Sequence, residues 1–122
     1  MISEVRAIAL AGGLLSLSVV ILAALGSHLI DMQGLQSIWQ TALNIHMFNA
    51  AAILGLAALL GIRQSRVLLW GAWSVVSGTI IFSGSIYLHI ITGQQLSGVA
   101  PAGGLLMMAG WVLVALSFVR KS

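Results

Sequence analysis

The sequence contains no cysteine and a single proline, and only 6% of its 122 residues are charged. The absence of cysteine excludes disulfides, thiolate nucleophiles, iron–sulfur clusters and cysteine metal sites. The shortage of charge excludes an ordinary soluble domain, because such a domain needs many more charged side chains to cover its surface. With 60% hydrophobic residues, most of the chain must be surrounded by lipid.

The few charged residues divide the chain into long apolar segments. They are Glu4, Arg6, Asp31, Arg63, Arg66, Arg120 and Lys121. The long charge-free runs contain 24 residues (7–30), 31 residues (32–62) and 53 residues (67–119). One membrane-spanning helix needs about 20 apolar residues, so the first two runs hold one span each and the third holds two. The sequence therefore predicts an all-α, polytopic membrane protein whose four transmembrane helices form an antiparallel bundle.

The predicted spans form a single domain over residues 1–122 and have a defined direction. We place the spans near 7–29, 42–62, 67–91 and 102–119, with a short interfacial helix at about 32–41. That helix is indicated by apolar residues at helical spacing and by Trp39 as its anchor. The run after Arg6 is longer than a signal-peptide core, so we expect it to be retained as the first span. All basic residues fall at one end of the bundle, and the positive-inside rule predicts that both termini lie on the cytoplasmic side of the inner (plasma) membrane.

Small residues recur along each predicted span at the spacing of one helix face. They are Gly12 and Ser16 in the first span, Ala51 and Gly55 in the second, Gly71, Gly78 and Ser85 in the third, and Gly103 and Gly110 in the fourth. Lipid tails are as apolar as leucine, so membrane helices associate through close backbone approach and interhelical hydrogen bonds. We predict that these residues form the helix-packing faces.

Three histidines, His28, His46 and His89, fall at nearly the same predicted depth, near the outer ends of the first three spans. Together with Asn49 and Ser85 they are candidate ligand-binding residues. Three neutral imidazoles could hold zinc or copper, and two could serve as axial ligands of a haem. A quinone or another small molecule is a further alternative. Histidines near an interface also hydrogen-bond to neighbouring helices or water, and no two of these have metal-ligand spacing within one helix. Structural hydrogen bonding is our leading interpretation, and we predict no cofactor.

The sequence shows no catalytic constellation. Asp31 is the only acid besides Glu4, so no acid–base pair is available. There is no glycine-rich phosphate loop followed by lysine and no nucleophile elbow. Five scattered basic residues form no basic face for nucleic acid. We expect a non-enzymatic protein whose partners are the lipid bilayer and other membrane proteins or further copies of itself. A small pore or permease is the remaining alternative, which the gathering of polar residues at one end disfavours.

Four segments carry a family resemblance that covers nearly the whole chain, in order and with similar spacing. They are ALGSHLI (24–30), WQTALNIHMFNAAAILGLA (39–57), GTIIFSGSIYL (78–88) and VAPAGGLLMMAGW (99–111). They resemble the domain-of-unknown-function 423 family, which includes small bacterial inner-membrane proteins and the eukaryotic transmembrane protein 256. The resemblance implies a four-helix membrane protein and brings no established activity.

The chain also departs from the pattern of that family. The family's first-span motif is Gly-Ala-His, of which Gly26 and His28 are kept here. The histidine of its second-span motif, Tyr-Gln-x-x-His, corresponds to Asn49, and His46 lies one turn earlier on the same face. His89 is not a feature of the family. If the two family histidines form a shared site, the resemblance implies that this chain has altered it.

Overall fold

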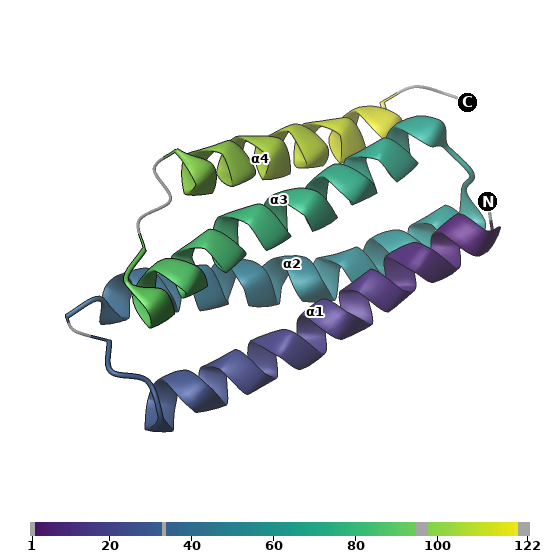
Figure 1. Ribbon diagram of the computed structural model, residues 1–122. Helices are drawn as coiled ribbons and strands as arrows, with labels where there is room; N and C mark the ends of the chain where they lie inside the picture. Colours follow the sequence, from purple (N-terminus) through teal and green to yellow (C-terminus); the bar gives the residue numbers. More distant parts are fainter. Residues whose placement is uncertain (1, 33, 95–97, 120–122) are drawn as a thin grey trace.

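The computed structural model describes residues 2–32, 34–94 and 98–119. These residues form four helices and no strand. The helices are α1 (Ile2–His28), α2 (Gln36–Ile62), α3 (Arg66–Thr92) and α4 (Val99–Ser117). Each helix is long and apolar enough to cross a membrane, and successive helices run in opposite directions (Figure 1). The prediction of an all-α membrane protein with four spans is confirmed.

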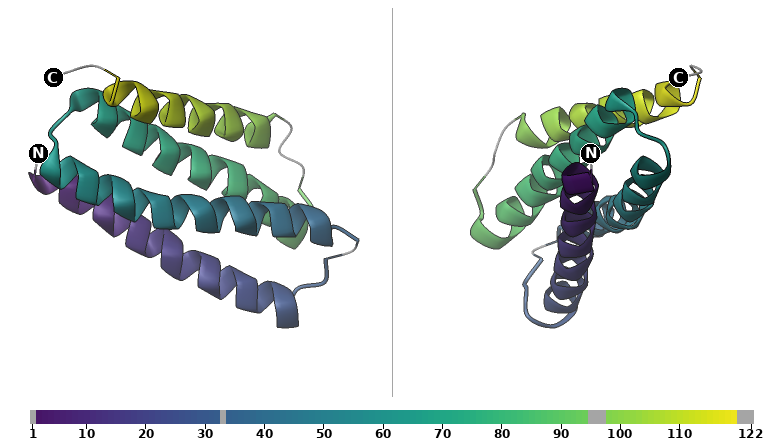
Figure 2. Two further views of the ribbon diagram at one scale, coloured as in Figure 1. Left: turned by 180° about the vertical axis from the view of Figure 1, so that it is seen from behind. Right: turned by 90° about the vertical axis from the view of Figure 1, so that its right-hand side faces the viewer.

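The helices are arranged so that each packs mainly on its neighbour in the sequence. α1 packs chiefly on α2, α2 packs on α1 and α3, and α4 packs along α3. Figure 2 shows α4 on the far side of α3 from α1. Within this arrangement α2 and α3 are the central pair, so residues on their facing sides are the ones that the fold buries.

The predicted interfacial helix at about 32–41 does not exist as a separate element. Residues 36–41 are instead the first turns of α2, which continues unbroken to Ile62. No glycine or proline interrupts the sequence between Gln36 and Leu54, so the backbone hydrogen bonds of the helix propagate through this region. The 27 residues of α2 extend for about 40 Å, whereas the hydrocarbon core of a bilayer is about 30 Å thick. The helix is therefore longer than the hydrocarbon core is thick, and its first turns contain the polar residues Gln36, Ser37 and Gln40.

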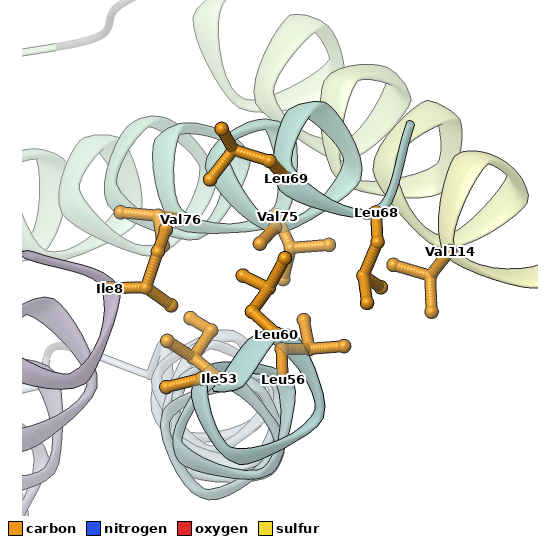
Figure 3. Close-up of a cluster of buried hydrophobic side chains, with 11 residues drawn as sticks. Ile8, Ile53, Leu56, Leu60, Leu68, Leu69, Val75, Val76 and Val114 are labelled. Carbon is orange, nitrogen blue, oxygen red and sulfur yellow. The ribbon is translucent and has the colours of Figure 1, made fainter. Parts of the chain in front are cut away.

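A cluster of buried apolar side chains fills the half of the molecule that carries the α2–α3 connection (Figure 3). It comprises Ile8, Ile53, Leu56, Leu60, Leu68, Leu69, Val75, Val76 and Val114, together with Ala57 and Ala72. A second cluster lies nearer the α1–α2 loop and includes Val19, Trp39, Leu43 and Tyr87. Along α2 and α3, the buried polar residues His46, Asn49, Thr79 and Ser83 lie between the residues of these two clusters.

Glycines allow α3 and α4 to approach at backbone distance. A Cβ atom added to Gly78 would lie 2.6 Å from the amide nitrogen of Met107, and one added to Gly103 would lie 2.5 Å from that of Phe82. Gly71 and Gly110 face each other in the same way, each with the carbonyl oxygen of the other at 2.9 and 2.8 Å from such a Cβ. Backbone atoms cannot move aside as side chains can, so this interface requires glycine at all four positions.

Of the predicted small faces of α1 and α2, only that of α1 packs against another helix of the chain. A Cβ on Gly12 would meet the side chain of Leu54 at 2.9 Å, so α1 uses this glycine to approach α2. The hydroxyl of Ser16 donates to the carbonyl of Gly12 within its own helix. Ala51 and Gly55, by contrast, are exposed, and a Cβ on Gly55 would have no described atom within 4 Å. The small face of α2 therefore points away from the other helices of the chain.

Candidate functional site

The amide side chain of Asn49 joins α2 to both α3 and α4. Asn49 is only 1% exposed. Its Nδ2 donates to the Thr79 hydroxyl at 2.9 Å and to the Met107 sulfur at 2.6 Å. Its Oδ1 accepts from the indole N–H of Trp111 at 3.2 Å. Both amide protons and the amide oxygen thus have partners, and one side chain holds three helices together.

His46 forms a second buried centre, one turn from Asn49 along α2. Its Nδ1 lies 2.9 Å from the Tyr87 hydroxyl on α3, and its Nε2 lies 3.1 Å from the Ser18 hydroxyl on α1. The Ser18 hydroxyl donates its only proton to the carbonyl of Leu15 at 2.9 Å. The serine oxygen must therefore accept from Nε2–H, which leaves Nδ1 free to accept from the tyrosine O–H. A neutral imidazole satisfies every group in this chain of contacts.

A third link lies another turn toward the start of α2. The hydroxyl of Ser83 on α3 donates to the backbone carbonyl of Ala42 at 3.0 Å. Ala42, His46 and Asn49 follow one another at spacings of four and three residues, so they lie on one face of α2. This face is a polar stripe inside an otherwise apolar molecule. Its groups are neutral and hydrogen-bonded to side chains of α1, α3 and α4, which suits them for holding the helices in register.

The structure does not bring the three histidines together. His46 lies inside the molecule, whereas His28 is exposed at the end of α1. The Nδ1 atom of His89 lies 3.2 Å from the carbonyl of Gln94, beyond the end of α3. Across residues 2–32, 34–94 and 98–119, no group of three His, Cys, Asp or Glu residues could hold a metal ion.

Helix rotation explains why similar depth did not bring the histidines together. Tyr87 faces His46, and two residues further along an α-helix the side chain has turned by about 200°. His89 must therefore point away from the centre that contains His46. Depth along a span can be read from the sequence, but rotation is fixed only by the packing of the whole set of helices.

The remaining candidate, Ser85, is buried, and its hydroxyl donates to the carbonyl of Phe82 in its own helix at 2.8 Å. It therefore does not share a centre with Asn49. Sequence reasoning missed the partners of the polar stripe, namely Ser18, Thr79, Ser83, Tyr87, Met107 and Trp111. Three of these follow one another at four-residue intervals along α3, at positions 79, 83 and 87, and that spacing was the available signal. Tyr87 also lies near the end of the predicted third span, where a tyrosine is common at the membrane interface whether or not it has a buried partner.

Comparison with known proteins finds one family that this chain resembles. The family model described as "Protein of unknown function (DUF423)" matches residues 22–104. A UPF0382 inner membrane protein of Escherichia coli strain K12 is 37% identical over 108 residues, covering 83% of this chain and 80% of the relative. A UPF0382 membrane protein of Staphylococcus haemolyticus is 32% identical over 82 residues, covering 66% of both chains. No solved structure gives a significant match.

Proposed function

The chain belongs to the domain-of-unknown-function 423 family, and from this premise we propose that it is a non-catalytic accessory or scaffold protein of the inner membrane. In this proposal α2 packs against a transmembrane helix of another membrane protein or of a second copy of the chain. The observation that supports this proposal is that the small residues on one face of α2, Ala51, Gly55 and Ala58, are exposed.

Two features of the molecule support a helix as the occupant of this face. Small residues in membranes serve chiefly to let helix backbones approach closely, and α3 and α4 use Gly78 and Gly103 in that way within this chain. The space above Gly55 is open, with no described atom within 4 Å of a Cβ placed there. The side chains of Phe48 and Leu54 flank the small residues; they contact Trp111 and Gly12, respectively, and their exposed parts would contact an arriving helix.

The proposal that the protein is non-catalytic rests on its buried polar groups. The side chains of Asn49 and His46 are fully engaged with Thr79, Trp111, Ser18 and Tyr87. A catalytic base or nucleophile must instead present a reactive atom to a substrate. The polar stripe of α2 therefore supports a structural role.

We further propose that both termini are cytoplasmic. Arg6, Arg63 and Arg66 all lie at the end of the molecule that carries the α2–α3 connection (Figure 1), while Arg120 and Lys121 lie outside the described residues. Because the chain has no cysteine, single thiols can report on each side. A membrane-impermeant maleimide is expected to label Ser37→Cys from the outside of intact cells, and Gln64→Cys only after permeabilisation. The reverse labelling pattern would invert the proposed orientation.

Association through α2 is tested by filling its small face. Gly55→Leu is expected to weaken association of the full chain in native membranes, measured by energy transfer between labelled copies and by native electrophoresis. Gly13→Leu is the matched control, because Gly13 is also an exposed helical glycine with no described atom within 4 Å of an added Cβ. Equal effects of the two variants, or isolation of the wild-type chain as a monomer with no associated protein, would contradict the proposal.

A further inference from the structure

The indole N–H of Trp39 is a buried donor without a hydrogen-bond partner among residues 2–32, 34–94 and 98–119. Trp39 lies at the start of α2 and is 4% exposed. Buried donors in native proteins nearly always have a partner, so an unpartnered one calls for a physical explanation. The indole N–H of Trp111, by contrast, donates to Asn49. The unpartnered N–H of Trp39 is therefore the one that needs an explanation.

Trp39 lines a cavity between α1 and α2, and its ring nitrogen is turned toward Gly26 of α1. The edge of the Trp39 ring rests on Gly26, where an added Cβ would collide with Nε1. Gly26 and Trp39 both line a cavity of about 140 Å³. Exposed side chains of Ser27, Gln36 and Gln40 are also part of its lining, so the cavity opens to the surroundings at the end of the molecule that carries the α1–α2 loop.

An apolar cleft continues from this cavity toward the middle of the membrane. It has a volume of about 210 Å³, and Val19, Val20, Leu43 and Met47 form most of its walls. The cleft and the cavity share lining residues, including Ala23. α1 and α2 diverge toward this end of the molecule (Figures 1 and 2). A cavity of about 150 Å³ already holds a benzene ring, so this cleft has room for a segment of hydrocarbon chain.

We propose that this cleft binds an acyl chain of an ester-linked membrane lipid, whose ester carbonyl accepts a hydrogen bond from Trp39 Nε1–H. The donor lies in the polar first turns of α2, and the apolar walls lie further along both helices, toward their middles. An ester lipid has the same gradient, with its acceptor at the interface and its hydrocarbon below. An ester carbonyl accepts and never donates, so it complements an indole N–H, which only donates.

Binding requires the contact between Gly26 and the Trp39 ring to open, because Nε1 is shielded from the surroundings while the two are in contact. α1 packs mainly on α2 and hardly at all on α3. A small outward movement of the end of α1 therefore disturbs few other contacts. This lipid site is independent of the proposed association through Gly55, which lies further along α2.

The test measures lipid retention by the full chain in mild detergent with native mass spectrometry. The probes are dioleoyl phosphatidylglycerol and its ether-linked analogue, which has the same chains and headgroup but no ester carbonyl. Wild-type protein is expected to retain one ester lipid per chain and to bind the ether analogue about three- to tenfold more weakly, as expected for the loss of one hydrogen bond. Trp39→Phe keeps a large ring but lacks the donor, so it should bind both lipids equally weakly.

A second variant blocks the cleft without relying on Trp39. Ala23 is exposed and lines both spaces, so Ala23→Phe should fold and exclude the acyl chain. The matched controls are Ala24→Phe, its exposed neighbour outside the lining, and Trp70→Phe, an exposed tryptophan on α3. Both controls should retain lipid as the wild type does. Circular dichroism of each variant checks the helical fold, and if Ala23→Phe does not fold, the ester–ether comparison in Trp39→Phe decides alone.

Several results would overturn the inference. Equal retention of ester and ether lipids by the wild type would show that the ester carbonyl makes no hydrogen bond to Trp39. Equal loss of lipid in Ala23→Phe and Ala24→Phe would show binding around the whole molecule instead of in this cleft. A co-purifying molecule that is not an acyl lipid and is lost only in Ala23→Phe would assign the cleft to a different ligand.

Discussion

Replacing Asn49 by leucine removes the hydrogen-bonding groups that join α2 to α3 and α4, while keeping the number and branching of the side-chain heavy atoms. The change deletes the bonds from Nδ2 to Thr79 and Met107 and the bond from Trp111 to Oδ1. Interhelical hydrogen bonds in membranes contribute about 0.6 kcal/mol on average and about 1.7 kcal/mol at most. The Thr79 hydroxyl keeps its bond to the carbonyl of Val75, but the Trp111 N–H loses its partner.

The loss of the two bonds from Nδ2, together with an indole N–H left without a partner, gives an expected loss of about 1–3 kcal/mol in the free energy of unfolding. Titration of the protein from mild detergent into sodium dodecyl sulfate, followed by circular dichroism, measures this loss. Asn44→Leu is the matched control, because Asn44 is exposed and its side chain accepts from Gln40 on the same helix. The control should change the free energy of unfolding by less than about 0.5 kcal/mol.

A double-mutant cycle between Asn49→Leu and Trp111→Phe isolates the bond between these two side chains. The expected coupling energy is about 0.6–1.7 kcal/mol, in the range of interhelical bonds in membranes. A coupling near zero, together with equal unfolding free energies for Asn49→Leu and Asn44→Leu, would refute the reasoning that this centre holds the helices together.

Two further predictions concern the contacts of α3. Gly78→Ala is expected to destabilise the protein by about 2 kcal/mol or more, because its Cβ would meet the Met107 backbone at 2.6 Å, which forces the helices apart. Gly84→Ala is the control, because its Cβ would meet no described atom within 4 Å, and it should be neutral or stabilising by up to about 1 kcal/mol. Thermal unfolding in detergent compares the two variants. Equal destabilisation would show that the close approach of α3 and α4 at Gly78 does not determine stability. Tyr87→Phe is expected to lower the free energy of unfolding by about 0.5–1.5 kcal/mol, because it removes the hydroxyl that lies 2.9 Å from His46 Nδ1. The same change in a His46→Phe background should cost much less. An undiminished cost there would show that the hydroxyl does not act through His46.

The four spans could be predicted from the sequence because hydropathy and charge are local properties. Charge-free runs longer than a bilayer crossing define helices without any knowledge of their neighbours. The same local reasoning misjudged the region 32–41, where polar and apolar residues alternate at helical spacing. Because the pattern contains no helix breaker between Gln36 and Leu54, the segment joined the following span as one helix.

The candidate site could be predicted only in part, because it depends on how each helix is rotated about its axis. Asn49 and His46 were identified as a shared face of α2, and the structure places them on the buried polar stripe. Their partners come from three other helices, and nothing local in the sequence fixes which side of α3 faces α2. The rotation of α3 turns His89 away from the centre that contains His46, and the rotation of α2 leaves Gly55 on the surface.

Disulfide trapping of single-cysteine variants in native membranes tests the proposed role of α2 most directly. The chain has no cysteine of its own, so Gly55→Cys on the small face and Gly13→Cys on α1 each introduce one thiol at an exposed helical position. The account predicts that mild oxidation crosslinks Gly55→Cys, to a second copy or to one discrete partner carrying a thiol, at a much higher yield than Gly13→Cys. Equal yields at the two positions, or no crosslink from Gly55→Cys to any protein, would contradict it.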